Sequence, residues 1–448
     1  MFYINVKPFV YAIAGLITVW VYANQSIAVA EEASNTAFFL EVRERVESLK
    51  NFNDKFYGTA PKAGQSSDTY LLSRIDFGLT HQVNEYLAAK FSLQDARVFG
   101  WGFKDEDWRN REFGNMINNP QADQMELGES WLEFKHDQIS LKLGRQPIAF
   151  GNKRVFGPGA WKNSGKWRWD AAKFTYTIEK NWVSAFYGRA MLHDPDEFSL
   201  SHHHGFRATG GYGHFELNDS LTIEPMLVTK ENNISLDYAK KDIYYYGTRL
   251  LFKKAGWLVD ATYLQQSGDT TKLTGGETKA DAQGANLDIQ YRINPKWMLS
   301  TTYGFASGDD KSTSNNEQFD GVYGAFDKYY GRMNLMAWSN LHDYGLLVNY
   351  RPTRDIELEM EYHQFYADDV KDTWLAYKNG LTASSKHYGN EIDLVATYNF
   401  DKRLEFMAGL GVFMPGDAIQ QAVAAKQANL TDTTAYSGFF QVIYHLDF

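Results

Sequence analysis

The chain ends in Tyr436-Ser-Gly-Phe-Phe-Gln-Val-Ile-Tyr-His-Leu-Asp-Phe448, a stretch in which apolar and polar side chains alternate. Because successive side chains of a β-strand point to opposite faces, one face is aromatic and aliphatic while the other carries Gln441, His445 and Asp447. The pattern is typical of the last strand of a bacterial outer-membrane β-barrel, which often ends on an aromatic residue. An edge strand of a soluble β-sandwich alternates in the same way, so the rest of the chain must distinguish the two folds.

The first 30 residues have the features of a cleaved secretory signal peptide. Lys7 supplies a basic start, an apolar stretch runs from Phe9 to Ala23, and Ala28-Val-Ala30 is a small-residue cleavage site. No later apolar run approaches the roughly 20 residues that a spanning helix needs. A membrane protein with this sequence is therefore expected to be a β-barrel, built as one domain from residues 31–448.

The composition agrees with a barrel that has a wet interior. The chain has 28 Tyr, 30 Phe and 12 Trp, yet its mean hydropathy is −0.45, which suits aromatic girdles around a polar lumen. It has no cysteine, so disulfides cannot stabilise it despite its predicted export. Its net charge of −10 argues against nucleic acid as a partner, because nucleic-acid binders are normally basic.

Segments with a two-residue period recur along the whole chain. Eighteen are predicted as strands, at 37–49, 69–82, 86–99, 124–136, 138–150, 169–178, 181–191, 206–217, 220–231, 241–254, 256–267, 281–293, 296–307, 341–351, 355–367, 386–399, 403–414 and 435–448.

The connections between these segments alternate between short and long. Short turns such as Asn84-Glu85 and Glu179-Lys180 are separated by long polar stretches such as 151–168 and 308–340. A sandwich has no reason to sort its loops in this way, whereas outer-membrane barrels have short periplasmic turns and long extracellular loops. The sequence thus predicts an all-β fold, a single-chain transmembrane antiparallel β-barrel of 18 strands in the outer membrane of a Gram-negative bacterium. Such a barrel leaves an aqueous lumen unless loops fill it.

Basic residues gather on the predicted inward faces of the first third of the chain. They are Arg43, Arg45, Arg74, Lys90 and Lys142, followed by Arg145, Lys153, Arg154, Lys162, Lys166 and Arg168, with Arg249 on a later strand. For any one of them, a cross-strand ion pair is the simpler interpretation, because carboxylates share these faces. Together they predict a positive strip that attracts polyanions and binds the carboxylates of an acidic sugar. Arg145 is ambiguous, since strict alternation places it with outward Leu143 but the register can shift near Pro147.

The same segment carries the clearest motifs. They are Leu143-Gly-Arg-Gln146, Phe150-Gly151, Arg154, Gly157, Trp161-Lys-Asn163 and Trp169-Asp-Ala171, followed in order by Ala306-Ser-Gly-Asp-Asp310, Tyr330-Gly331, Trp374-Leu-Ala-Tyr377, Gly389-Asn-Glu-Ile-Asp393 and Phe413-Met-Pro-Gly416. This ordered set resembles the alginate-export family of outer-membrane proteins. The resemblance implies an 18-stranded monomeric barrel and a passive channel, in which an arginine-rich constriction selects an anionic polyuronate. Arg145 and Arg154 lie in the matching motif, and Arg74 is on an early inward face.

Other chemistry finds little support in the sequence. Thr80 and His81 are adjacent on a predicted strand and so face opposite sides of the wall, and Ser201-His202 lies in a predicted loop without a third catalytic partner. No enzymatic activity or cofactor is expected. His202-His203-His204 lacks the spacing of a metal site. Asp309 and Asp310 are weak candidates for a calcium site at the extracellular rim.

The interpretation that follows is an outer-membrane channel for passive diffusion of an anionic poly- or oligosaccharide. The alternative is a substrate-selective or general porin for uptake of small solutes or other oligosaccharides. The expected partners are outer-membrane lipid, the saccharide, and the barrel-assembly machinery, which would recognise the C-terminal strand that ends at Phe448.

Overall fold

The computed structural model describes residues 35–51, 67–110, 116–157, 159, 161–165, 167–195, 197–198, 203–232, 241–271, 276–324, 328–373, 380–427 and 430–448. The predicted signal peptide, Lys166, Ser201-His202 and the Trp374–Tyr377 motif lie outside these residues. Among the described residues, no helix combines the length and apolar character needed to cross a membrane.

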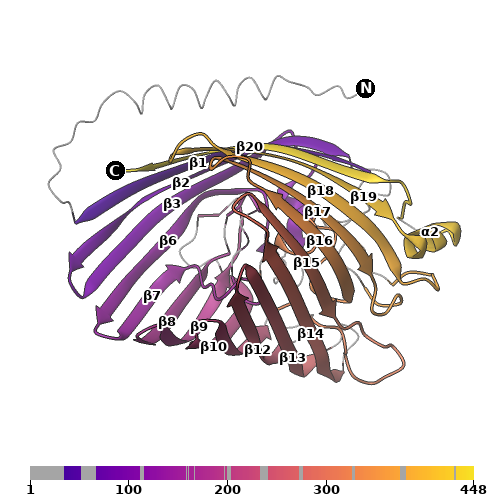
Figure 1. The fold of residues 1–448 in the computed structure, drawn as a ribbon, viewed down its shortest axis with the longest axis horizontal. Coiled ribbons are helices and arrows are strands. Elements are labelled where there is room, and N and C mark those ends of the chain that lie inside the picture. Colours follow the sequence, from indigo (N-terminus) through magenta and orange to yellow (C-terminus); the bar gives the residue numbers. More distant parts are fainter. Residues whose placement is uncertain are drawn as a thin grey trace.

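Eighteen antiparallel strands form one sheet (Figure 1). They are β1 (Thr36–Lys50), β2 (Asp68–Asn84), β3 (Leu87–Phe99), β6 (Asp123–His136), β7 (Ile139–Gln146), β8 (Trp169–Ile178), β9 (Asn181–Met191), β10 (His203–Asn218), β11 (Leu221–Asn232), β12 (Lys241–Lys254), β13 (Trp257–Thr271), β14 (Glu277–Arg292), β15 (Trp297–Ala306), β16 (Leu341–Tyr350), β17 (Ile356–Tyr366), β18 (His387–Asn399), β19 (Leu404–Pro415) and β20 (Ala435–Asp447). Each pairs with the next along the chain, and β1 also pairs with β20. The sheet is therefore a closed barrel, as predicted.

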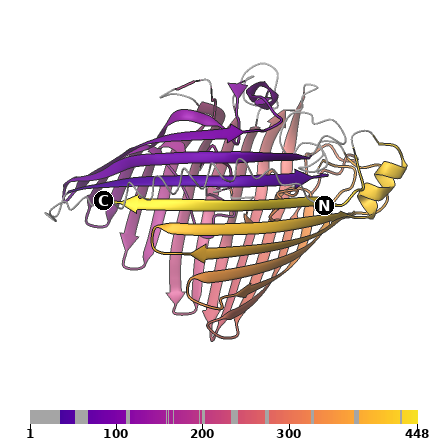
Figure 2. The same ribbon diagram turned by 90° about the horizontal axis from the view of Figure 1, so that it is seen from above.

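The remaining elements lie in long connections between strands. The 3₁₀ helix η1 (Asp105–Trp108) and the short strands β4 (Arg109–Asn110) and β5 (Met116–Ile117) precede β6. Helix α2 (Asp417–Ala424) lies between β19 and β20, at the end of the barrel opposite the C-terminus (Figure 2). Long and short connections thus leave opposite ends of the barrel.

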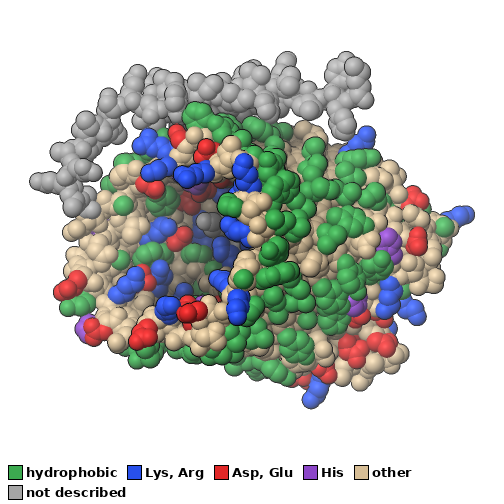
Figure 3. Space-filling view, in the orientation of Figure 1, with side chains coloured by type: hydrophobic (Ala, Val, Ile, Leu, Met, Phe, Trp, Pro, Cys, Tyr) green, Lys and Arg blue, Asp and Glu red, His purple; other side chains and the backbone are tan. Residues whose placement is uncertain are grey.

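Alternation along each strand separates a lipid-facing surface from the lumen. On β17, the Leu358 and Met360 side chains are 40% and 47% exposed on the outside, whereas Glu361 and His363 are buried on the inside. Figure 3 shows the apolar outer surface beside a hollow lined by basic and acidic side chains. This is the arrangement that a barrel in lipid requires, because its outer side chains meet hydrocarbon.

One strand, β7, is much shorter than predicted, whereas the other strand ends differ from the prediction by a few residues. The sequence pattern extended the fifth strand to residue 150, but β7 ends at Gln146. Gly144 has a φ of +116°, which disturbs the regular strand, and Pro147 has no N–H to continue the ladder. The chain then turns into the lumen instead of continuing along the wall.

The barrel closes at its first and last strands. Phe38 and Phe448 exchange two backbone hydrogen bonds of 2.8 and 3.0 Å, and their rings stack with centroids 5.6 Å apart. The last residue therefore completes the ladder between β1 and β20.

Deletion of Phe448 should reduce the fraction of chain that assembles into a folded barrel, because it removes both hydrogen bonds and the ring stack. The measurement is the heat-modifiable folded band on electrophoresis after outer-membrane insertion. Phe400→Ala, which removes an aromatic ring that is 55% exposed in a turn, is the matched control and should assemble normally. Equal assembly of both variants would contradict the role assigned to the closing strand.

Candidate channel constriction

Two long connections fold into the lumen and meet there. We call residues 147–168, between β7 and β8, the first lumen loop, and residues 307–340, between β15 and β16, the second lumen loop; their described parts run through the barrel interior in Figure 1. They join through a parallel bridge between Phe156 and Tyr323, with the Gly157 N–H donating to the Tyr323 carbonyl at 3.0 Å. The constriction is thus built from segments far apart in sequence.

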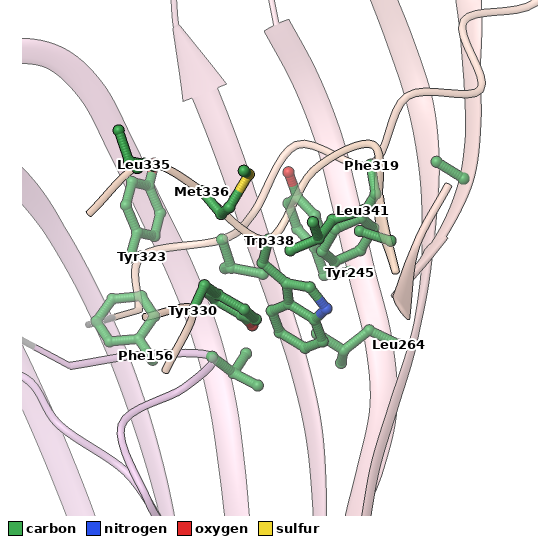
Figure 4. Packing of buried hydrophobic residues seen from close by; sticks show 14 of the residues in the cluster. Phe156, Tyr245, Leu264, Phe319, Tyr323, Tyr330, Leu335, Met336, Trp338 and Leu341 are labelled. Atoms are coloured by element: carbon green, nitrogen blue, oxygen red, sulfur yellow. The ribbon is translucent and has the colours of Figure 1, made fainter. Parts of the chain in front are cut away.

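An aromatic cluster supports this junction. Phe156 contacts Trp169 and Tyr323 with ring centroids 5.4 Å from each, and all three side chains are buried. Figure 4 shows Tyr330, Trp338 and Phe319 continuing the cluster along the second lumen loop. Burying this many rings inside the barrel fixes the loops by the hydrophobic effect, since each ring removes a large apolar area from water.

The first lumen loop is bound to β1 by two predicted arginines. The Arg45 guanidinium donates to the Trp161 carbonyl at 2.7 Å and lies 3.9 Å from the centre of the Trp161 ring. Arg43 donates to the Lys162 carbonyl and to Asn163 Oδ1. Phe439 of β20 packs edge-on against Trp161 at 4.7 Å. These arginines hold the loop against the wall through its backbone carbonyls.

The same loop reaches the opposite side of the barrel through Arg154. Arg154 Nη2 lies 2.9 Å from Asp288 Oδ2 on β14, and its guanidinium stacks 3.8 Å above the Tyr329 ring of the second lumen loop. Burial raises the pKa of Tyr329 to about 12, so its hydroxyl stays protonated and donates to the Asn152 carbonyl. Arg154 therefore links the wall and both loops.

The second lumen loop is held by two further ionic clusters. Asp320 accepts hydrogen bonds from Lys230 at 2.8 Å and Lys241 at 2.6 Å, on β11 and β12. Arg332 contacts Glu361 at 2.5 Å and Glu359 at 3.0 Å, both on β17.

Gly331 brings the loop backbone against β18. It has a φ of +78°, and a Cβ there would lie 2.2 Å from Glu391. This close approach gives a physical reason for glycine in the Tyr330-Gly331 motif.

Four basic side chains come together where the loops cross. Lys153 and Arg154 belong to the first loop, and Lys328 and Arg332 to the second. Burial lowers the pKa of Lys328, and the nearby Lys153, Arg154 and Arg332 lower it further, which reflects their mutual repulsion. Lys153 and Lys328 are the exposed residues of the group, although the Lys328 ammonium lies 5.1 Å from the centre of the Tyr329 ring and is partly shielded from water. We call these four residues the crossing cations.

A pocket of about 400 Å³, partly open to solvent, lies between the two loops and the wall of β1, β18, β19 and β20. Its polar and aromatic lining consists of Glu47, Trp161, Arg332, Asn334, Asp393, Ser437 and Phe439. The lumen thus offers an aromatic ring, hydrogen-bonding groups and a guanidinium within one concave surface.

Most of the predicted basic residues have acidic partners. Arg45 pairs with Glu47, Arg74 with Glu41, Lys90 with Glu129, Lys142 with Glu133, Arg168 with Asp76, and Arg249 with Glu224 and Asp260. The structure brings these residues to the lumen side of the wall, but as parts of a balanced network. Their role in selectivity stays a prediction.

The ambiguity at Arg145 is resolved. Leu143 is 39% exposed on the outer surface, but Arg145, two residues on, is 2% exposed and pairs with Glu126 at 3.2 Å and Asp170 at 2.8 Å. The left-handed conformation of Gly144 separates the two orientations. Arg145 is therefore buried in the wall rather than placed in lipid.

The cations on the second lumen loop are not predicted by the sequence pattern. Lys328 and Arg332 lie in an irregular segment, where two-residue periodicity carries no information about orientation. Lys173 on β8, which pairs in register with Lys142, is likewise not among the basic residues predicted to line the lumen. The only available signal was the proximity of Arg332 to the Tyr330-Gly331 motif.

The predicted calcium candidates engage in local contacts. Asp309 accepts from Lys311 Nζ at 2.5 Å, and the same ammonium lies 3.2 Å from Asp372. Asp310 accepts the Ser312 N–H at 2.9 Å. Within the described ranges, no group of three or more acidic or histidine side chains has a geometry that could hold a metal ion.

Asp320→Asn should loosen the second lumen loop, raise single-channel conductance, and lower the free energy of barrel unfolding by about 1–3 kcal/mol, because two charge-assisted hydrogen bonds weaken. Burial raises the pKa of an aspartate, but Lys230 and Lys241 outweigh it and hold the pKa of Asp320 well below its ordinary value. The stabilisation by Asp320 is therefore fully present at pH values above the pKa that this carboxyl has in the unfolded chain. It is lost only as the pH falls through the lower pKa that the carboxyl has in the folded barrel. Wild-type conductance should stay low as pH falls from 7 to about 4.

Asp310→Asn is the matched control, since Asp310 lies on the same loop and is exposed. It should leave conductance unchanged. If both variants conduct like the wild type, Asp320 does not hold the loop in place.

Comparisons with known proteins agree with this architecture. The sequence profile of the alginate export family matches residues 35–432. Alginate production protein AlgE of Pseudomonas aeruginosa is 25% identical over 206 residues, which cover 39% of this chain and 40% of that protein. AlgE of Azotobacter vinelandii is 25% identical over 149 residues, covering 28% and 30%. The matched segments thus span less than half of these relatives.

Solved structures share the fold at low sequence identity. Acinetobacter baumannii OccAB2 has a TM-score of 0.61 at 11% identity, and P. aeruginosa OccK8 (OprE) has 0.60 at 10%; each comparison covers 92% of this chain and 98% of that one. Family and fold indicate a channel. The chain belongs to the alginate export family, and it is an outer-membrane β-barrel channel of porin-like architecture.

Proposed function

We propose that the channel conducts an anionic poly- or oligosaccharide, such as a polyuronate, across the outer membrane by passive diffusion. The observation that carries the proposal is the group of crossing cations, Lys153, Arg154, Lys328 and Arg332, at the junction of the two lumen loops. A solute that passes this junction meets cations from both loops. Positive groups between low-dielectric walls concentrate anions and speed their entry.

The surroundings of the crossing cations suit a sugar chain. The pocket beside Arg332 combines Trp161 with Asn334, Ser437 and carboxylates, which can interact with a sugar ring and its hydroxyl groups. A guanidinium fork matches the geometry of a carboxylate. On the other side of the lumen, Lys142 lies 3.9 Å from the Trp131 ring, a second pairing of a cation with an aromatic ring.

Acidic side chains near the crossing cations weaken the electrostatic attraction of an anionic solute but do not abolish it. Arg154 and Arg332 are neutralised largely by Asp288, Glu359 and Glu361. Lys153 and Lys328 are the more exposed members of the group. We infer that these two lysines contribute most of the selectivity, while the paired arginines fix the shape of the passage.

Export from the periplasm fits membership of the alginate export family, with the solute gradient or an inner-membrane machine as the driving force. Because the sheet closes on its own first and last strands, we infer that one chain forms a complete channel. Outer-membrane lipid around the apolar surface and the barrel-assembly machinery at the C-terminal strand complete the set of proposed partners.

The test is ion selectivity in planar bilayers under a salt gradient. The wild-type channel should prefer anions, and a short oligouronate should block its current. The double variant K153Q/K328Q should shift the reversal potential toward cations and weaken the block, because it removes both exposed crossing cations without leaving a buried carboxylate unpaired.

K50Q/K426Q is the matched control, because it makes the same charge change at exposed sites outside the constriction. It should leave selectivity unchanged. A wild-type channel that prefers cations and is not blocked by the oligouronate would instead support the general porin.

A further inference from the structure

The rim formed by the short turns is unevenly charged. Four consecutive turns connect β12 to β13, β14 to β15, β16 to β17, and β18 to β19. Counted with one flanking residue on each side, they carry seven exposed basic residues, Lys254, Arg292, Lys296, Arg351, Arg354, Lys402 and Arg403, against two acidic ones, Asp355 and Asp401. We call the seven basic residues the basic arc.

The other four short turns have the opposite balance. Counted in the same way, they carry Lys180 as their one basic residue against four acidic ones, Glu85, Asp137, Glu179 and Asp219. In a chain whose net charge is −10, the basic arc is a local concentration of positive charge.

A pocket lies within the basic arc. It is open to solvent, with an empty volume of about 240 Å³, and it is lined by Arg292, Asn294, Pro295, Lys296, Trp297, Met298, Asn349 and Arg351. Arg351 Nη2 lies 2.8 Å from Glu357 Oε1, and Asn349 also donates to this carboxylate. Asn349 also donates to Glu359, but Glu359 pairs with Arg332, so Glu357 is the carboxylate left to offset the three cations of the pocket, and the pocket stays positive.

The strand register places Arg292 and Arg351 of the pocket on the lumen side. Met298 of β15 pairs with Arg292 on one side and with Asn349 on the other, and directly paired residues share a face of the sheet. Asn349 is buried inside the barrel, so Arg292 faces the lumen. Arg351 follows Asn349 by two positions and has the same parity.

An aromatic pair marks the lipid side, and its member Trp297 also forms the outer edge of the pocket. The Trp297 and Tyr350 rings stack with centroids 4.1 Å apart, and both residues have outward parity. Arg292 and Arg351 therefore have the parity of the channel side, opposite to the parity of the aromatic pair.

We propose that this pocket is a docking subsite for carboxylates of the polyanionic saccharide, which it binds at the short-turn mouth before the chain reaches the crossing cations. Arg292 and Arg351 supply planar forks for carboxylates, and Lys296 adds a mobile point charge. The remaining basic arc raises the local concentration of the polyanion. The subsite rests on the proposed function and extends it, because it assigns the short-turn mouth as the side from which the saccharide enters the channel.

The experiment measures current block by a short oligouronate added to one chamber at a time. Since the chain has no cysteine, Asp219→Cys in a rim turn reports channel orientation through a thiol reagent added to one side. In this background, R292Q/K296Q/R351Q should raise the half-blocking concentration from the short-turn side about tenfold, since three exposed charge contacts are lost. Block from the long-loop side should be unchanged.

R354Q/K402Q/R403Q is the matched control, because it removes three cations of the same arc outside the pocket. An equal loss of block in this control would overturn the subsite in favour of a diffuse rim charge. An effect of the pocket variant that disappears in bilayers of uncharged lipid would also overturn it, in favour of a headgroup contact.

Two further outcomes separate the subsite from the proposed function. If the oligouronate blocks the wild-type channel and blocks the pocket variant equally well, the subsite is overturned but the proposed function is not. Absence of wild-type block from either side would overturn the proposed function, and the subsite with it. Heat-modifiable migration of each variant checks that the barrel is folded.

Discussion

The hydrogen-bond ladder between β1 and β20 is the constraint on which the rest of the structure depends. In hydrocarbon, an unpaired backbone N–H or carbonyl group has no water to bind, so a sheet in a membrane must have no free edge. The pairing of Phe39 with Asp447 and of Lys50 with Tyr436 spans almost the whole length of both strands. Once the sheet is closed, its alternating side chains necessarily divide into an apolar exterior and a polar interior.

Inside that wall, the arginines act mainly as structural links. Arg45 holds the backbone of the first lumen loop, Arg154 joins this loop to β14, and Arg332 joins the second loop to β17. A buried cation is tolerated because each has a carboxylate or carbonyl partner, and removing one partner of such a pair is strongly destabilising. The ion-paired arginines therefore determine the shape of the passage, whereas the few exposed cations produce most of its positive electrostatic potential.

The fold could be predicted from the sequence because each strand of the wall repeats one simple physical rule. On β17 the outward positions are apolar and the inward ones polar, so its extent and orientation follow directly. The rule fails where a single residue changes the backbone, as Gly144 does beside Arg145. The alternation rule gives no information about the lumen loops, where contacts with distant strands determine the positions of Lys328 and Arg332. The constriction thus depends on tertiary packing that periodicity cannot express.

The anchoring of the lumen loops has a consequence for the order in which the channel matures. Arg154 and Asp288 are separated by 134 positions in the chain, and the second loop draws on β11, β12, β17 and β18 at once. Contacts of such long range can form only after the strands that supply them are in place. We therefore expect the passage to narrow only once these distant strands have joined the wall during biogenesis.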